Sequence, residues 1–305
     1  MLPTRVQGQP TLRRLHSNQQ SQLVIAHLGT AKRELVYQTS QLIEAPNWSP
    51  DGGALVYNAD GKVYRLPLQG GQSPSLIETG NLCDLNNDHL ISPDGDWIYV
   101  SSDDGHIYRI KSAGGAPERV TNDQNAQRGV RHYLHGISPD GSMLAYVGLE
   151  VLDGSVVTKI SLIPSSGGMD RVLTDGGCPV DGPEFSPDGQ WIYFNSEAAA
   201  QRSGHAQIFR MRPDGQGLEQ LTFDERVNWF PHISPDGKHM AYLSYPEGTQ
   251  GHPADRAVII RLVAPDGQGV VQDIDAFNGG QGSINVPSWS PDSRAFAYVR
   301  YPMTD

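Results

Sequence analysis

Three histidines and one glutamate stand close to a repeated Ser-Pro-Asp turn and could together bind a divalent metal. His89 and His135 lie three residues before the serine of the turn, whereas Glu184 and His232 lie two residues before it. Imidazole and carboxylate groups are ligands for Zn, Mn and Fe in proteins. If the four side chains converge, we expect one of these metals as a cofactor. The alternative is that they hydrogen-bond neighbouring loops or line a wet channel, because alternate residues of a strand point to opposite faces.

The segments that lead into the same turns carry further residues suited to ligand binding. Tyr133 and Trp229 could stack on a sugar ring, and nearby amides and carboxylates could bond its hydroxyl groups. Two connections, 196–207 and 245–256, are longer than their counterparts, and long loops in a compact repeat are often functional. Ordinary loop packing is the alternative. The candidate ligand-binding residues are Asn47, Asn87, Tyr133, Asp181, Asn228, Trp229 and His252.

The turn that orders these residues occurs six times. Proline presets φ at its first corner, aspartate can bond the backbone ahead, and the glycine of five copies accepts a positive φ. The copies follow one another at intervals of about 43 to 56 residues, a period that indicates a propeller or a solenoid. They begin at Ser49, Ser92, Ser138, Ser186, Ser234 and Ser290.

Each repeat can be divided into four short strands. Apolar residues stand six and eight positions after every repeat serine, which predicts a second strand with one buried face. Segments such as VYRL (63–66) and IFRM (208–211) predict a third strand, and ERVT (118–121) and EQLT (219–222) predict a fourth. Four strands per repeat are typical of a propeller blade, so we expect an all-β fold.

The two ends of the chain predict how the ring closes. The last repeat stops after its second strand, while 25–28 and 34–40 match a third and a fourth strand without the first two. Together they would form one shared closing blade, which removes two exposed sheet edges. We therefore expect a six-bladed β-propeller with four antiparallel strands per blade as a single domain over 18–305, preceded by an N-terminal leader over 1–17.

Composition excludes several classes of protein. A formal net charge of −11 disfavours binding to nucleic acid or to an anionic membrane surface, since both require clustered Lys and Arg. No apolar run approaches transmembrane length, so membrane insertion is not expected. The N-terminal residues lack the apolar core of a secretory signal. The chain as given is expected in the cytoplasm, or in the periplasm if a signal has been removed.

The stretch 183–222 resembles the TolB-like propellers with their WD40-like Pro-Asp (PD40) repeats. It contains PEFSPDGQWIYFNSE, then QIFRMRPDGQGLEQLT, and so shows the turn, the alternating strand and the Leu-Thr ending of that family. The resemblance covers about 18–301. Full TolB carries an additional N-terminal α/β domain, for which this chain has no room, so a role in the Tol–Pal system does not carry over directly. Prolyl-oligopeptidase-like peptidases share such blades but need a G-x-S-x-G motif, which is absent from this sequence.

The resemblance implies a non-enzymatic binding or interaction module, with a protein partner or a small-molecule or carbohydrate ligand at the mouth of the central channel. The alternative is a metal-dependent carbohydrate-active enzyme similar to oligogalacturonate lyase, which uses channel-mouth histidines to hold a metal. That family is seven-bladed, whereas this chain has six repeats. A third possibility is a partner-docking scaffold that binds a peptide across the channel.

Overall fold

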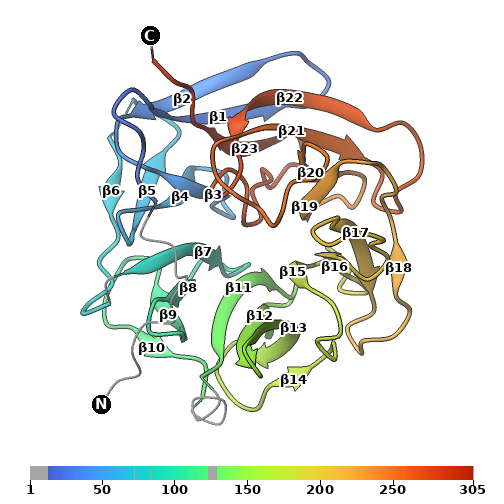
Figure 1. Cartoon of the computed structure of the whole chain (residues 1–305). Helices are drawn as coiled ribbons and strands as arrows, with labels where there is room; N and C mark the ends of the chain where they lie inside the picture. Colours follow the sequence, from blue (N-terminus) through green and yellow to red (C-terminus); the bar gives the residue numbers. More distant parts are fainter. Residues whose placement is uncertain (1–12, 72, 83, 123–128, 305) are drawn as a thin grey trace.

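The computed structural model, which describes residues 13–71, 73–82, 84–122 and 129–304, consists of six antiparallel sheets arranged in a ring. Figure 1 shows these sheets as blades around a common centre, in chain order. The all-β, six-bladed propeller expected from the repeats is therefore confirmed. Within each complete blade the four strands lie side by side in chain order. The first of them, which precedes the repeated turn, lies nearest the centre of the ring (Figure 1).

Five blades have four strands each. Blade one consists of β3 (Glu44–Trp48), β4 (Ala54–Ala59), β5 (Lys62–Pro67) and β6 (Ser75–Leu76). Blade two consists of β7 (Leu85–Ile91), β8 (Trp97–Ser102), β9 (Ile107–Lys111) and β10 (Glu118–Arg119). Blade three consists of β11 (Arg131–Ile137), β12 (Met143–Leu152), β13 (Ser155–Pro164) and β14 (Arg171–Val172). Blade four consists of β15 (Val180–Phe185), β16 (Ile192–Ser196), β17 (Gln207–Met211) and β18 (Glu219–Gln220). Blade five consists of β19 (Val227–Ile233), β20 (Met240–Tyr245), β21 (Arg256–Val263) and β22 (Gln272–Gly279).

The closing blade joins the two ends of the chain as the sequence predicts. Its regular strands are β1 (Ser21–His27), β2 (Arg33–Thr39) and β23 (Ala295–Arg300), in the order β2-β1-β23. The innermost place is taken by the irregular segment 283–290, in which Trp289 forms a bridge to Phe296. The carbonyl of Ser288 also accepts a 2.9 Å hydrogen bond from the amide of Ala297.

The serine of each repeated turn holds the turn together. In the first copy the Ser49 hydroxyl donates to the Asp51 carboxylate over 2.6 Å and accepts from the amide of Ala54 over 2.9 Å. The same pair of bonds occurs in the other five copies. The hydrogen bond from serine lowers the pKa of the turn aspartate, as it does for Asp51. The repeated aspartates are therefore turn residues.

The second strand of each blade is buried on both faces, and the expectation of one buried face is wrong. In β4, Leu55 and Tyr57 pack toward the closing blade, while Val56 packs toward blade two. The reason is that every blade lies between two others in a closed ring. Six apolar clusters result, one at each junction between neighbouring blades.

The structure describes only residues 13–17 of the expected N-terminal leader. Residues 1–12 lie outside the described residues, so the leader stays a prediction there. Arg13, which falls within the expected leader, contacts the propeller: its guanidinium lies 3.8 Å from the centre of the Tyr301 ring and 3.2 Å from the Asp255 carboxylate. The described residues contain no helix long and apolar enough to cross a membrane.

Candidate functional site

The inner strand of each complete blade is interrupted by a β-bulge shortly before the repeated turn. In β3 the register shifts between Glu44 and Asn47, and equivalent shifts occur in β7, β11, β15 and β19. At the bulges of β3 and β19 the residues Ala45 and Phe230 adopt positive φ angles of 53° and 54°, a conformation that costs a non-glycine residue about 1–2 kcal/mol. A bulge changes the direction of the side chains beside it. Simple alternation therefore fails for the residues just before each repeat serine.

Polar side chains from four inner strands and two loops meet where the inner strands begin, and we call them the mouth network. His135 Nε2 lies 3.0 Å from the carboxylate of Asp181, whose other oxygen lies 3.5 Å from His252 Nε2. His252 Nδ1 contacts the Gln281 side-chain oxygen over 2.5 Å. The Gln281 amide donates to Asn87 over 3.5 Å. The mouth network consists of Glu44, Asn87, His135, Asp181, His252, Gln281 and Asn285.

The charged side chains at the centre of the mouth network stabilise one another. Burial alone would lower the pKa of His135, but the carboxylates of Asp88 and Asp181 outweigh it and raise that pKa to about 9. Burial would raise the pKa of Asp181, yet hydrogen bonds from His135 and His252 hold it well below its usual range. Burial raises the pKa of Asp88. At neutral pH, His135 and Asp181 therefore form an ion pair.

The innermost segment of the closing blade packs against the mouth network. Its segment 280–286 carries Ile284 and Val286, both fully buried. The carbonyl of Asn285 lies 3.2 Å from His135 Nδ1, and that of Ile284 lies 2.6 Å from His232 Nε2. Imidazoles from blades three and five therefore hold the innermost segment of the closing blade.

The four predicted metal ligands lie on inner strands, but their side chains contact different partners. His89 Nε2 lies 3.2 Å from the carbonyl of Val56, and burial lowers the pKa of His89 to about 4. Glu184 contacts His232 Nδ1 over 2.5 Å. His135 belongs to the mouth network. Within the described ranges, no three His, Cys, Asp or Glu side chains are grouped so that they could hold a metal ion. The metal site stays a prediction.

Of the predicted ligand-binding residues, Asn87, Asp181 and His252 belong to the mouth network and Trp229 adjoins it. The ring of Trp229 lies 4.5 Å from that of His252, and its indole nitrogen is buried without a partner among the described residues. Because Asp181 and His252 keep 22% and 30% of their side-chain area exposed, the network can be reached from solvent.

The other three predicted ligand-binding residues make separate contacts. The hydroxyl of Tyr133 accepts from Arg131 over 3.2 Å. Asn228 is fully buried and bonded to Gln207, Asp224 and Ser244. Asn47 is 5% exposed and pairs with Val56 across the sheet. These contacts do not link the three residues to the mouth network.

Several residues of the site are missing from the sequence-based prediction. Glu44 and Asn285 belong to the network, and Asp88 acts on it electrostatically. Arg13 donates to the carbonyl of Gln281 over 2.7 Å and lies 3.8 Å from Glu44. Two of these residues, Glu44 and Asn285, could have been found from the sequence. Both stand five residues before a repeat serine, and that position carries a polar or aromatic side chain in all six repeats. This set is Glu44, Asn87, Tyr133, Asp181, Trp229 and Asn285.

Comparisons with known proteins agree with the fold. A family model described as the TolB beta propeller domain matches residues 136–259. An uncharacterized protein of Agrobacterium fabrum is 42% identical over 286 residues, which cover 92% of each chain. A solved structure from Agrobacterium tumefaciens, provisionally named TolB, superposes with a TM-score of 0.85 at 41% identity. It covers 93% of this chain and 99% of that one.

A more distant relative carries an established name. The Tol-Pal system protein TolB of Francisella tularensis is 24% identical over 272 residues, which cover 86% of this chain but only 58% of the relative. The chain thus spans somewhat more than half the length of that protein. The repeats, the ring of six sheets and these matches show that the chain belongs to the TolB-like β-propeller family with Pro-Asp repeats.

Proposed function

We propose that this chain is a non-enzymatic binding module that holds a segment of a partner protein at the mouth network. The observation that carries the proposal is that side chains five residues before the repeat serines meet in one network. One scaffold position presents six side chains, of which Glu44, Asn87, Asp181 and Asn285 are joined in a single hydrogen-bonded network. A fixed scaffold with variable side chains around one opening is typical of a recognition surface.

The chemistry of the network suits a polypeptide. It offers acceptors from Glu44 and Asp181 and amide donors from Asn87 and Gln281, and the largely buried ring of Trp229 lies beside it. A polypeptide supplies matching donors, acceptors and apolar side chains at short intervals. The TolB relative is named as a protein of the Tol-Pal system, which favours a protein partner over a carbohydrate. The contacts of His89, His135, Glu184 and His232 do not favour the alternative of a metal-dependent carbohydrate-active enzyme.

Site-specific photo-crosslinking tests the proposal. A photoreactive phenylalanine analogue would replace His252, whose side chain is 30% exposed beside the network. The same analogue at Met169, which is 73% exposed between β13 and β14 on the opposite face, is the matched control. After irradiation in the native host, we expect a discrete protein adduct at position 252 and none at 169. No adduct at 252, or the same adducts at both positions, would contradict the proposal.

A further inference from the structure

Arg13 fills a pocket that adjoins the mouth network. Its guanidinium lies 3.8 Å from the centre of the Tyr301 ring. Its two terminal nitrogens donate to the carbonyl of Gln281 over 2.7 Å and to the Asp255 carboxylate over 3.2 Å, and the Glu44 carboxylate lies 3.8 Å away. Only 14% of the Arg13 side-chain area is exposed. We call Glu44, Asp255, Gln281 and Tyr301 the guanidinium pocket.

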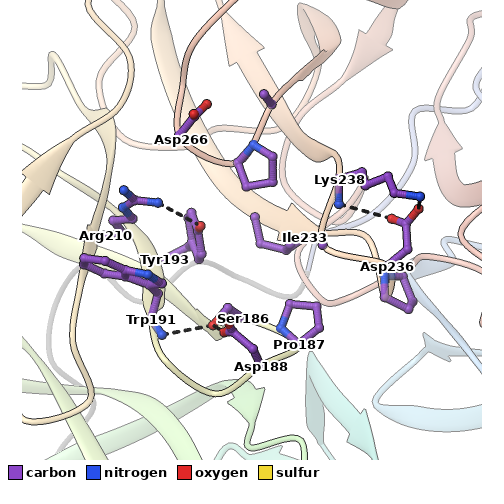
Figure 2. A pocket seen from close by; sticks show the side chains of 14 residues that line it. Ser186, Pro187, Asp188, Trp191, Tyr193, Arg210, Ile233, Asp236, Lys238 and Asp266 are labelled. Carbon is purple, nitrogen blue, oxygen red and sulfur yellow. Dashed lines mark hydrogen bonds and ion pairs between the residues drawn. The ribbon is translucent and has the colours of Figure 1, made fainter.

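This stacking differs from the contacts between arginine and tryptophan within the blades. In blade two Arg109 lies 4.4 Å from the centre of the Trp97 ring, and in blade four Arg210 lies 4.2 Å from that of Trp191. Figure 2 shows the second of these pairs among the side chains that line a pocket between blades four and five. Because the two pairs stand at equivalent positions of the repeat, they belong to the scaffold. Arg13 lies outside the repeats, so no scaffold position explains its contacts.

The walls of the guanidinium pocket are held by contacts that do not involve Arg13. Tyr301 is fully buried, and its hydroxyl donates to the carbonyl of Ile43 over 2.9 Å. Gly282 adopts a φ of 86°, and a Cβ atom at this position would collide with the Glu44 carboxylate and the Tyr301 hydroxyl. The carboxylate and the ring can therefore approach each other only because a glycine lies between them. We expect the pocket to keep its shape when Arg13 is removed.

The guanidinium pocket favours a cation because its two carboxylates are largely withdrawn from water. The side chains of Glu44 and Asp255 keep 14% and 28% of their area exposed. Burial raises the pKa of Glu44, and the positive charge of Arg13 opposes that effect. An ionised carboxylate is costly to bury unless a cation or hydrogen bonds compensate it. Whatever replaces Arg13 in the pocket should therefore carry a positive charge.

The geometry of the pocket favours a guanidinium over an ammonium group. A planar guanidinium can lie on the Tyr301 ring while the N–H groups at its edge donate to acceptors on two different segments, and a compact ammonium lacks that shape. Arg13 uses the pocket incompletely, because its Nε is buried without a hydrogen-bond partner among the described residues. An unpaired buried donor weakens the contact. An arginine that enters along another path and pairs its Nε would therefore displace Arg13.

We propose that the guanidinium pocket selects an arginine side chain of the partner segment, and that Arg13 takes this place in the chain without its partner. The pocket shares Glu44 and Gln281 with the mouth network, so a segment held at the network lies next to the pocket. The inference rests on the function proposed above and adds the chemistry of the partner, a segment that contains an arginine. The partner and Arg13 would then compete for the same two carboxylates.

Titration with N-acetylarginine amide tests the pocket without a partner. In Arg13→Ala the pocket is open, and we expect the probe to shift the backbone amide signals of Gln281 and Gly282 in nitrogen-15 NMR. The Kd should be about tenfold or more below that of the wild type, in which Arg13 leaves only a minor fraction of the pockets free. N-acetylcitrulline amide, which has a similar shape but no charge, should not bind. Arg13→Gln is a second variant that keeps a longer side chain and should also bind the probe.

Arg14→Ala is the matched control for the titration, because Arg14 is exposed and its replacement removes the same charge while Arg13 stays in place. This variant should bind the probe no better than the wild type. No binding to either Arg13 variant, equal binding of the arginine and citrulline probes, or equal binding by Arg13→Ala and Arg14→Ala would overturn the proposal.

Photo-crosslinking in the native host separates this inference from the function proposed above. With the photoreactive analogue at position 252, Arg13→Ala should give a severalfold higher yield of the partner adduct than Arg14→Ala, because Arg13 no longer competes with the arginine of the partner. The same yield in both variants would overturn this inference and leave the proposed function standing. No adduct in any variant would overturn both.

Discussion

The imidazole of His135 lies 3.0 Å from the carboxylate of Asp181, and this pair joins blade three to blade four at the mouth network. His135 is 5% exposed, so its charge is stabilised almost entirely by protein groups. Asp88 on blade two adds a second carboxylate that favours the protonated ring. The pair is therefore both a link between blades and the electrostatic centre of the site.

The first prediction concerns the protonation of this histidine. We expect the His135 ring to titrate with a pKa of about 9, because Asp88 and Asp181 outweigh the effect of burial. In Asp181→Asn the pKa of His135 should fall toward its ordinary value, since one carboxylate is lost. Nitrogen-15 NMR of the histidine side chains across pH 6 to 10 measures both. A wild-type His135 pKa below 7 would contradict the assignment.

The second prediction is a loss of stability at alkaline pH. The pKa of His135 is raised from 6.5 to about 9 on folding, so its contribution is fully present below about pH 6.5 and disappears as the pH rises through 9. The loss should be roughly 3 kcal/mol of unfolding free energy at most. Urea unfolding at pH 6.5, 8 and 9.5 measures it. The same decrease in Asp181→Asn would show that another group is responsible.

The third prediction tests the core of the closing blade. Leu23 is fully buried in β1, between blade one and the closing blade. Leu23→Ala should lower the unfolding free energy by about 2–5 kcal/mol, because it removes buried apolar surface and leaves a cavity. Leu35 in the neighbouring strand β2 is 50% exposed, so Leu35→Ala should change the unfolding free energy by less than about 0.5 kcal/mol. Equal effects in denaturant titrations would contradict the packing described.

The fourth prediction tests ring closure itself. Deletion of residues 18–40 removes β1 and β2, and β23 then loses its partner from Gln22↔Arg300 to His27↔Ala295. The exposed strand edge and the opened apolar junction should cause aggregation. Size-exclusion chromatography and thermal unfolding measure the result. A monomer with an unchanged melting curve would show that the shared blade is not needed for closure.

Much of the fold follows from the sequence because the repeat is local. The serine and aspartate of each turn make their hydrogen bonds within six residues, as Ser49 does with Asp51 and Ala54. The strands after each turn can therefore be assigned without knowing the neighbours. The number of blades and the pairing of β1 with β23 also follow, since an incomplete repeat at each end leaves one way to complete a blade.

The site could be predicted only in part. Asp181, His252 and Trp229 are recognisable because polar and aromatic residues stand where other repeats differ. Alternation along a strand gave no means to separate His89, which bonds the carbonyl of Val56, from His135, which meets Asp181. The bulges change side-chain direction, and they depend on how inner strands pack around the centre.

By itself, the sequence determined the all-β class, the six blades and the shared closure, because these depend on turn chemistry and on periodic burial within each repeat. Only the tertiary structure decided which side chains meet across blades. Gln281 reaches Asn87 although 194 residues separate them, and His135 meets the carbonyl of Asn285 across 150 residues. Contacts between blades depend on the shape of the whole ring, which no single repeat encodes.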